Sequence, residues 1–249
     1  MSRIRVFFFA SLLLAGCTQS RLDKTVKMKS FVSESAKGCE YDSTNCSRFT
    51  VNYPEFPGLE QLVQDRIQQK IVLLVRGDAD DPRDSFELLG EGFQKDYADF
   101  KKEFPDGGGS WQRNIDISLL LFGDSLLSLQ YTEESYTGGA HGNNLVAFIN
   151  LDPKTGELVK LDRLLKPGYE ETLRTVGEEI FRQNRELADT ASYENSGFQF
   201  TNDKFALNDN YGFSREGISF YFNSYEVAPY VMGPTEVMIP YDRIREWLK

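Results

Sequence analysis

The segment from residue 136 to residue 142 brings together the residue types best suited to chemistry near neutral pH. It reads Tyr136-Thr137-Gly-Gly-Ala-His141-Gly, and His141 is the single histidine of the chain. Histidine changes charge between pH 5 and 8, and glycines let a backbone approach a ligand closely. We expect Tyr136, Thr137 and His141 to bind a ligand at a loop tip, with His141 as a donor or proton shuttle. The alternative is a wide hairpin connection whose histidine bonds a neighbouring strand.

A second candidate recognition surface lies between residues 221 and 234. Tyr225 and Tyr230 accompany Glu226 there, in a segment rich in proline and glycine. Tyrosines on a rigid loop combine apolar contact area with a polar hydroxyl, which suits recognition. We expect these three residues to contribute to a ligand site, and packing around a bulged strand connection is the alternative. An acid such as Glu226 beside His141 in one cleft would instead supply an acid–base pair.

Most familiar catalytic patterns are missing from the sequence. It contains no Gly-x-Ser-x-Gly motif and no second histidine for a triad, and glycines 107–109 are not followed by the residues of a phosphate loop. Adjacent acids such as Glu133-Glu134 suggest the carboxylate pair of a glycosidase, but 38 acids make such adjacency common by chance. One histidine and three cysteines argue against a metal centre, so we expect no metal and no cofactor.

The first residues read as a targeting signal. Arg3 and Arg5 precede an apolar run from residue 6 to 14, which is too short to span a bilayer. The run ends in Leu-Ala-Gly-Cys17, which resembles the lipobox of bacterial lipoproteins and implies cleavage after residue 16 and lipidation of Cys17. The partner expected from this motif is a membrane, reached through the lipid. Thr18 favours the outer membrane facing the periplasm if the cell is Gram-negative. An ordinary secretory signal with a chance cysteine is the alternative.

The remaining two cysteines and the net charge fit an extracytoplasmic protein. Cys39 and Cys46 flank a short polar loop, and we expect a structural disulfide in an oxidising compartment. Removal of residues 1–16 deletes two arginines and no acid, which takes the formal charge from −10 to −12. Such a charge excludes nucleic acid as the expected partner, because phosphate binding needs a basic face, and it attracts basic proteins.

Hydrophobic periodicity predicts the elements that position these residues. Residues 17–38 read as a polar tether, and residues 189–204 as a polar loop. Strands are expected at 48–53, 111–122, 125–133, 145–151, 218–223 and 235–240. Helices are expected at 58–77, from Asp81-Pro82 to Phe104, at 169–187 and at 241–249. The prediction is therefore an α+β fold, with an N-terminal strand–helix unit packed on a mostly antiparallel sheet and one or two further helices.

Several of these segments, taken together, resemble one known family. They are 136–142, 149–156, 161–165 and 220–241, together with Phe49-Thr-Val-Asn-Tyr-Pro54 and its helix. The combination is similar to the PdaC/RsiV-like envelope proteins, which pair a small N-terminal domain with a C-terminal domain of unknown function. The resemblance implies domains at 39–106 and 107–249. It also implies an envelope recognition module, since relatives include a lysozyme-sensing anti-sigma factor and a module that precedes a peptidoglycan deacetylase domain.

The sequence thus favours a non-enzymatic, lipid-anchored binding protein of the bacterial cell envelope. Its expected partner is either a basic protein such as lysozyme or the glycan of peptidoglycan. One alternative is a cell-wall hydrolase or deacetylase-like enzyme that uses His141 and a nearby acid. A structural envelope lipoprotein is the other. Neither an anti-sigma segment nor a deacetylase domain is evident in the 249 residues, so we expect neither activity.

Overall fold

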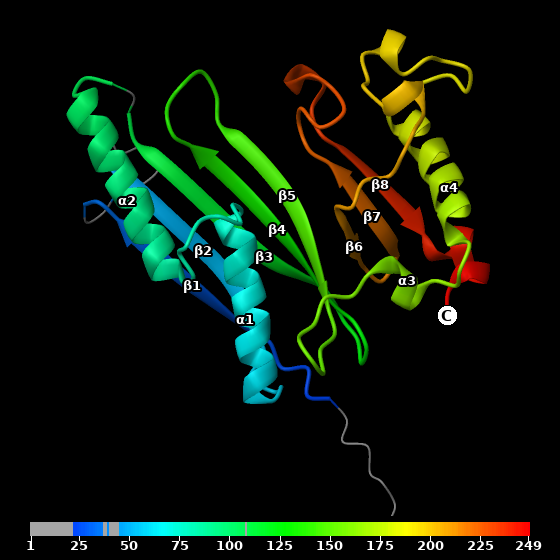
Figure 1. The fold of residues 1–249 in the computed structure, drawn as a ribbon, viewed down its shortest axis with the longest axis horizontal. Helices are drawn as coiled ribbons and strands as arrows, with labels where there is room; N and C mark the ends of the chain where they lie inside the picture. Colours follow the sequence, from blue (N-terminus) through cyan, green and yellow to red (C-terminus); the bar gives the residue numbers. More distant parts are fainter. Residues whose placement is uncertain (1–21, 37–38, 40–44, 108) are drawn as a thin grey trace, which may run out of the picture.

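A computed structural model describes residues 22–36, 39, 45–107 and 109–249 of the protein. The predicted signal peptide and the predicted lipidation site at Cys17 lie outside these residues. The described residues form two β-sheets that lie beside one another, each with its own helices and its own hydrophobic core (Figure 1). The mixture of helices and strands confirms the predicted α+β class.

The first sheet has five strands in the order β1-β2-β3-β4-β5. They span Lys27–Glu34, Ser47–Glu55, Trp111–Phe122, Leu127–Tyr136 and Asn143–Leu151. Neighbours pair antiparallel except β2 and β3, which run parallel with Val51 opposite Ile115. A parallel connection needs a crossover, and helices α1 (Gln61–Arg76) and α2 (Phe86–Glu103) provide it.

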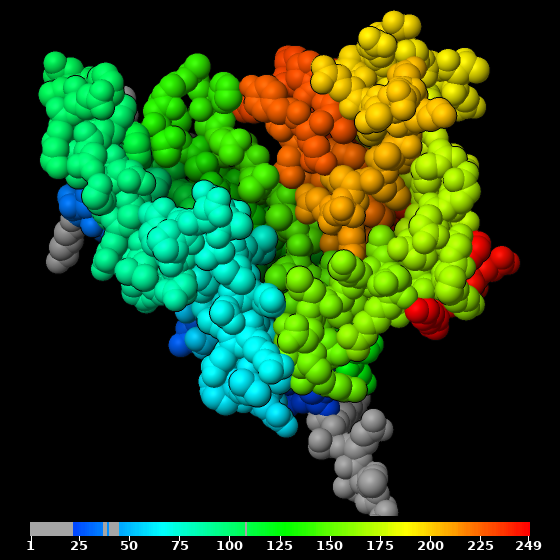
Figure 2. All heavy atoms as spheres, viewed as in Figure 1, coloured from blue at the N-terminus to red at the C-terminus, as the bar shows by residue number. Residues whose placement is uncertain are grey.

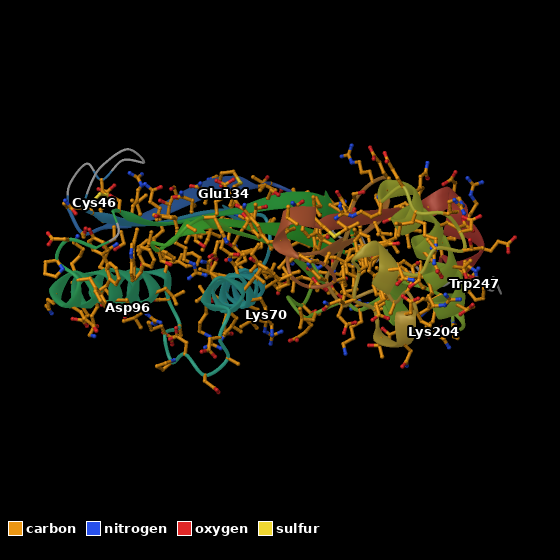
Figure 3. The ribbon with its side chains drawn as sticks, turned by 90° about the horizontal axis from the view of Figure 1, so that it is seen from above. Cys46, Lys70, Asp96, Glu134, Lys204 and Trp247 are labelled. Atoms are coloured by element: carbon orange, nitrogen blue, oxygen red, sulfur yellow. A yellow bond between two sulfur atoms is a disulfide. The ribbon has the colours of Figure 1, made fainter. Side chains whose placement is uncertain are left out.

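Both crossover helices cover the same face of the first sheet, as Figure 3 shows from above. Alternate strand residues point to that face, and they pack on the apolar stripe of α1. Phe49, Val51, Ile115 and Ile71 are completely buried in this core. The opposite face carries polar side chains, as the bond from Asn52 to Asp116 illustrates. The sheet therefore buries one face under the helices, and its other face is polar.

Helix α2 begins later than the sequence predicts. The predicted start at Asp81-Pro82 is wrong, because the Asp81 carboxylate pairs with Arg83 instead of capping a helix. Ser85 is the actual N-cap, and its hydroxyl accepts from the Leu88 amide at 3.2 Å. The apolar face of α2 packs on the first core, with Phe86 and Tyr97 buried.

The predicted tether at 17–38 contains an unexpected strand. Residues 27–34 form β1, which pairs with β2 along its whole length. As an edge strand it exposes most of its side chains, so its composition resembles that of a linker. Strand β1 nevertheless packs closely on α2 at Gly90. A Cβ at that position would lie only 2.8 Å from the Ser33 side chain, so a larger residue would not fit.

The first sheet also continues across the domain boundary predicted at residues 106 and 107. Strands β1 and β2 precede that point and β3, β4 and β5 follow it, yet all five share one sheet. A break in sequence character at the glycine-rich segment 105–109 marks only the end of α2. The structural division falls after β5, where the second core begins.

The second sheet has three antiparallel strands in the order β6-β7-β8. These strands span Tyr211–Phe213, Gly217–Phe222 and Thr235–Pro240. Helix α4 (Tyr169–Asn184) packs on β8. Helix α3 (Leu161–Leu164) is a single turn. The predicted closing helix is a 3-10 helix, Tyr241–Trp247. Residues 189–204 are not the polar surface loop that the sequence predicts, because Tyr193 and Phe198 are buried against Phe181.

Two further expectations concern segments outside the sheets. Cys39 and Cys46 form the predicted disulfide, with their Cα atoms 5.9 Å apart. Among the described residues, no helix is both long and apolar enough to cross a bilayer.

Candidate functional site

The loop that carries the histidine joins strands β4 and β5 at one end of the molecule. Gly138 and Gly139 have φ angles of 96° and 99°, which residues with a Cβ rarely adopt. The Tyr136 hydroxyl donates to the Gly139 carbonyl at 3.0 Å and holds the first half of the loop. His141 is exposed, and its Nδ1 lies 2.8 Å from the Gly142 carbonyl oxygen. The glycines therefore let the backbone turn, and the His141 ring remains exposed on the surface of the loop.

Three rings from two distant segments stack beside this loop, and we call them the aromatic stack. The His141 ring lies on Tyr230, with ring centres 4.4 Å apart and planes 17° apart. The Tyr225 ring lies on Tyr230 at 5.4 Å and 30°. Figure 2 shows the green β4–β5 loop and the orange β7–β8 connection side by side at this end of the molecule. Two loops far apart in sequence thus form one exposed aromatic surface.

The β7–β8 connection holds Tyr225 in an unusual conformation. Its φ angle is 69°, in the left-handed region that costs a residue with a Cβ about 1–2 kcal/mol. Tyr225 is 64 % exposed and its ring contacts Tyr230, so burial in a core does not explain the strain. The neighbouring Glu226 carboxylate accepts from the Asn223 amide at 2.9 Å and from the Asn208 side chain at 2.6 Å. Glu226 therefore closes the turn that presents Tyr225.

Arg185, just after α4, holds the other end of the same connection. Its guanidinium donates to the carbonyl of Met232 at 2.9 Å, to that of Gly233 at 3.2 Å and to the Thr235 hydroxyl. Burial lowers the pKa of Arg185. Since guanidinium donors have a fixed fork geometry, this arginine fixes the path of the backbone directly after Tyr230.

A hollow of about 520 Å³ lies next to the aromatic stack, and we call it the inter-sheet groove. Its floor is the open polar face of the β4–β5 pair, where Thr132 faces Val146 and Glu134 faces Asn144. Its wall comes from the other half of the protein and consists of residues 221, 223–224 and 230–234. Tyr230 belongs to both features, so the groove and the stack form one continuous surface.

Two asparagines join the sheets at the base of the groove. The Asn223 carboxamide accepts from the Val146 amide at 2.8 Å and donates to the Val146 carbonyl at 2.9 Å. Asn210 accepts from the Phe148 amide at 3.1 Å and also donates to the Val146 carbonyl. These side chains occupy the positions that a sixth strand would take along β5. The edge of β5 is therefore closed at Val146 and Phe148, and the wall of the groove is fixed to its floor.

The structure brings together three of the predicted site residues: His141, Tyr225 and Tyr230. Tyr136 and Thr137 lie on the same loop, but Tyr136 bonds within it, and the described residues offer the Thr137 side chain no hydrogen bond. Glu226 does not pair with His141, because both of its carboxylate oxygens are bonded to asparagines of its own half. A ligand-binding role for these residues stays a prediction.

The adjacent acids of β4 do not form a catalytic pair. Consecutive strand residues point to opposite faces, so Glu133 enters the core while Glu134 faces the groove. Glu133 pairs with Arg113 at 2.8 Å and accepts from the Tyr131 hydroxyl. Burial, and then the Glu133 charge, raises the pKa of Tyr131, and this network ties β3 to β4.

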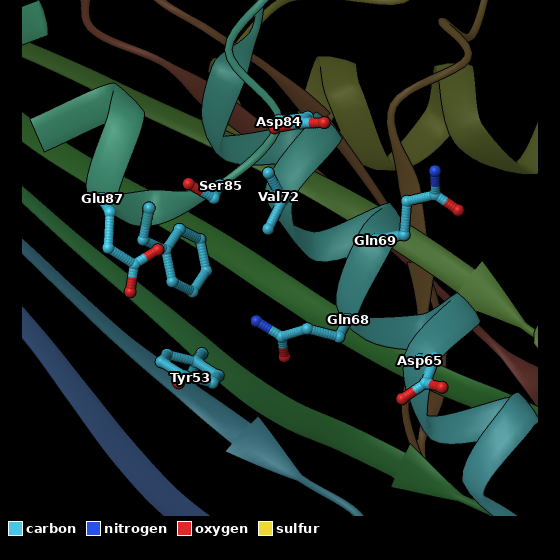
Figure 4. Close-up of a pocket in the computed structure, with 9 residues that line it drawn as sticks. Tyr53, Asp65, Gln68, Gln69, Val72, Asp84, Ser85 and Glu87 are labelled. Atoms are coloured by element: carbon cyan, nitrogen blue, oxygen red, sulfur yellow. The ribbon is translucent and has the colours of Figure 1, made fainter.

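A second hollow, of about 390 Å³, lies over β2 between α1 and α2 (Figure 4). Three acids border it, namely Asp65, Asp84 and Glu87, and none of them is buried. No cluster of three or more His, Cys, Asp or Glu side chains suited to a metal occurs in the described part of the protein. The three carboxylates are exposed on the surface, so the hollow is not a candidate metal site.

The sequence gives no direct signal for Asn210, Asn223 or Arg185. Each is a polar residue next to a strand or a helix end, where such residues are common. Their importance follows from the backbone groups that they reach in distant segments.

Comparisons with known proteins match each half of the protein. Residues 40–144 match the family model described as deacetylase PdaC, and residues 162–242 match a protein family of unknown function, DUF3298. The boundary between the matches falls near the end of the first sheet and differs from the predicted one. The floor of the groove lies largely in the first match and its wall in the second.

One curated relative is the peptidoglycan-N-acetylmuramic acid deacetylase PdaC of Bacillus subtilis. It is 24 % identical over 162 residues, which are 63 % of this protein and 33 % of the relative. The match thus spans about a third of that relative's length. Solved DUF3298 proteins from Bacteroides fragilis and Pseudomonas aeruginosa share the fold. The Bacteroides protein has a TM-score of 0.68 and 21 % identity, and the alignment covers 92 % of this protein and 96 % of that one. The Pseudomonas protein has a TM-score of 0.64 and 20 % identity, and the alignment covers 92 % of this protein and 97 % of that one.

Proposed function

Because the protein belongs to the PdaC-like family, we propose that it is a non-enzymatic binding protein of the cell envelope that recognises cell-wall glycan. A lipid on Cys17 anchors it to a membrane, in the outer membrane facing the periplasm if the cell is Gram-negative. The relative's substrate, N-acetylmuramic acid in peptidoglycan, supports this ligand class. In this proposal the folded body holds the glycan, and the anchor keeps it close to the wall.

The aromatic stack is the observation that carries the proposal. The apolar faces of pyranose rings pack well on aromatic rings, and tyrosine hydroxyls add polar contacts. Tyr225 and His141 are exposed beside a polar groove, and aromatic rings with a few convergent polar groups are the usual composition of a small-molecule site. The strained φ of Tyr225 supports the same conclusion, because strain is typically retained where a side chain must be presented.

The catalytic alternative has less support from the geometry. A hydrolase or deacetylase-like enzyme that used His141 would need an acid within hydrogen-bond reach. The Glu226 carboxylate closes its own turn instead. Glu134 faces the groove, but as a single exposed carboxylate it is better suited to accept hydrogen bonds from sugar hydroxyls.

A basic protein such as lysozyme is a second candidate ligand, favoured by the formal charge of −12 that remains after removal of residues 1–16. An attraction of this kind weakens as salt screens the charges, whereas stacking on apolar ring faces does not. Salt dependence therefore separates the two ligands.

Co-sedimentation of the full-length protein with purified peptidoglycan tests the proposal. We expect salt-resistant binding that Tyr225→Ala weakens by about two- to tenfold, since loss of one aromatic contact is worth about 0.5–1.5 kcal/mol. Phe104→Ala is the matched control, because Phe104 is 49 % exposed just after α2 and distant in sequence from the stack. Binding to immobilised lysozyme alone, at low salt only, would contradict glycan recognition.

The anchor is tested separately by membrane fractionation of cells that express the protein. We expect the wild type in the membrane fraction and Cys17→Ser in the soluble fraction, because a cleaved protein without its lipid keeps no anchor. A Cys17→Ser variant that stays with the membrane to the same extent would contradict lipid anchoring.

A further inference from the structure

Backbone groups at the edge of β5 bind the side-chain amides of two asparagines, Asn223 and Asn210. At Val146, the Asn223 carboxamide supplies an oxygen to the backbone N–H and a nitrogen to the backbone carbonyl. At Phe148, the Asn210 carboxamide oxygen accepts from the backbone N–H. In each case one amide stands where the peptide of a neighbouring strand would stand.

The same edge is open one step further along, at Asn144. In an antiparallel pair, alternate residues direct both backbone polar groups away from the partner strand. Val146 and Phe148 direct theirs away from β4, so Asn144 does too, and Asn144 lines the inter-sheet groove. Among the described residues, none bonds to the outward N–H or carbonyl of Asn144. Asn144, which lines the groove, therefore presents one outward donor and one outward acceptor at the edge of β5, at the spacing that a single amide matches.

We propose that this open position of β5 binds the acetamido group of an N-acetylated sugar, a step that rests on the proposed glycan binding. The acetamido carbonyl accepts from the Asn144 backbone N–H, and the acetamido N–H donates to the Asn144 backbone carbonyl. The contact repeats the one that Asn223 makes with Val146. Tyr230 borders the same groove, so the sugar ring bearing the acetamido group lies toward the aromatic stack.

The geometry favours a single acetamido group over an extended peptide. A peptide that adds to a sheet bonds to several alternate residues of the edge strand. Along β5 the next two such residues, Val146 and Phe148, are already bonded by Asn223 and Asn210. Only one outward residue of the strand therefore remains within the groove, which suffices for one amide but not for a strand.

Affinity of the full-length protein for two neutral hexasaccharides tests the inference. The probes are the β-1,4-linked N-acetylglucosamine hexamer and cellohexaose, which has a hydroxyl in place of each acetamido group. We expect the acetylated hexamer to bind about tenfold more tightly, because two neutral hydrogen bonds are gained. Asn144→Ala keeps the backbone groups and should retain this ratio. Asn144→Pro removes the outward N–H without removing a β4–β5 bond, and should reduce the ratio below about threefold.

A second measurement covers the case in which Asn144→Pro does not fold. Hydrogen exchange of the Asn144 amide in the wild type should slow on addition of the acetylated hexamer and stay unchanged with cellohexaose. Three results would overturn the acetamido site while glycan binding stands. They are equal affinity for the two hexamers, an unchanged affinity ratio in folded Asn144→Pro, and hydrogen exchange of the Asn144 amide that the acetylated hexamer does not slow. Failure to bind either hexamer or peptidoglycan overturns the proposed function itself. Tighter binding of an N-acetylated, C-amidated pentaalanine makes the occupant a peptide and also overturns the inference.

Discussion

The Asn223 side chain and the Val146 backbone form a complete amide pair across the junction of the two sheets. Oδ1 accepts from the Val146 N–H at 2.8 Å, and Nδ2 donates to the Val146 carbonyl at 2.9 Å. Asn223 directly follows β7, whereas Val146 lies in the middle of β5. One side chain thereby fixes the distance between the wall and the floor of the inter-sheet groove.

Replacement of Asn223 by alanine should destabilise the protein measurably. The buried Val146 N–H loses its partner, whereas the Val146 carbonyl keeps the Asn210 carboxamide, and an unsatisfied buried donor costs about 1–3 kcal/mol. Urea unfolding of Asn223→Ala should show a decrease of this size in the free energy of unfolding. Asn52→Ala is the control, because the bond from Asn52 to Asp116 is exposed and its loss should change stability by less than about 0.5 kcal/mol. Equal losses for the two variants would contradict a special role for Asn223.

The strands of this fold were predictable where one face is buried. Alternation of Phe49, Val51 and Tyr53, and the long runs at 111–122 and 145–151, follow directly from one-sided burial. The edge strand β1 escaped prediction, because it buries few side chains and its pairing depends on a neighbour that the local sequence does not reveal. The aromatic core residues of 189–204 escaped for a similar reason, since they are separated by polar residues without a regular period.

The candidate site was predictable in its residues but not in its contacts. Glycine spacing and tyrosine content singled out His141, Tyr225 and Tyr230 as special. That His141 and Tyr225 both stack on Tyr230 depends on how β5 meets β7, which Asn210 and Asn223 decide. Such long-range polar contacts have no periodic signature in a single sequence.

Reduction of the disulfide should destabilise the first half of the protein. The bond closes a short ring between Cys39 and Cys46, and the chain-entropy model gives about 2–3 kcal/mol for such a ring. The double variant Cys39→Ser, Cys46→Ser should show this loss in urea unfolding, and a reducing agent should destabilise the wild type equally. An additional effect of the reducing agent on the double variant would indicate that it acts elsewhere.

Asp152 should make stability dependent on pH in the acid range. Burial raises the pKa of its carboxyl, but hydrogen bonds from the Lys154 amide and from Arg163 outweigh burial, and the net pKa lies below the ordinary 3.8. A lowered pKa means that the stabilisation is complete above pH 3.8 and is lost as the pH falls through the lower folded-state value. The melting temperature of the wild type should therefore exceed that of Asp152→Asn near pH 6, and the difference should shrink below pH 3.8.

Arg163→Ala provides the intermediate case for this pH dependence. The variant keeps the Lys154 amide as a donor to Asp152, so it should retain part of the difference from Asp152→Asn. Melting curves that run parallel at all pH values for the wild type and Asp152→Asn would contradict this origin of the acid sensitivity.

Arg185→Lys should loosen the connection that carries Tyr230. A lysine ammonium cannot reproduce the fork that reaches Met232, Gly233 and Thr235 together, and hydrogen bonds from charged groups contribute about 1.5–3 kcal/mol. We expect faster hydrogen exchange over residues 230–235 and weaker peptidoglycan binding. Arg243→Lys is the control, because its partner Glu179 lies in an exposed pair that a lysine can preserve. Similar exchange in both variants would contradict the positioning role of Arg185.

Substitutions of Tyr225 should separate stability from binding. Tyr225→Gly removes the ring and also relieves the positive φ, so its free energy of unfolding should stay within about 1 kcal/mol of the wild type. Tyr225→Ala keeps a Cβ at φ 69° and should be less stable than Tyr225→Gly. Both variants should lose peptidoglycan binding to the same extent in co-sedimentation, because both lack the exposed ring. If Tyr225→Gly bound as well as the wild type, the strain at this position would serve the turn alone, and the aromatic stack would not be the recognition surface.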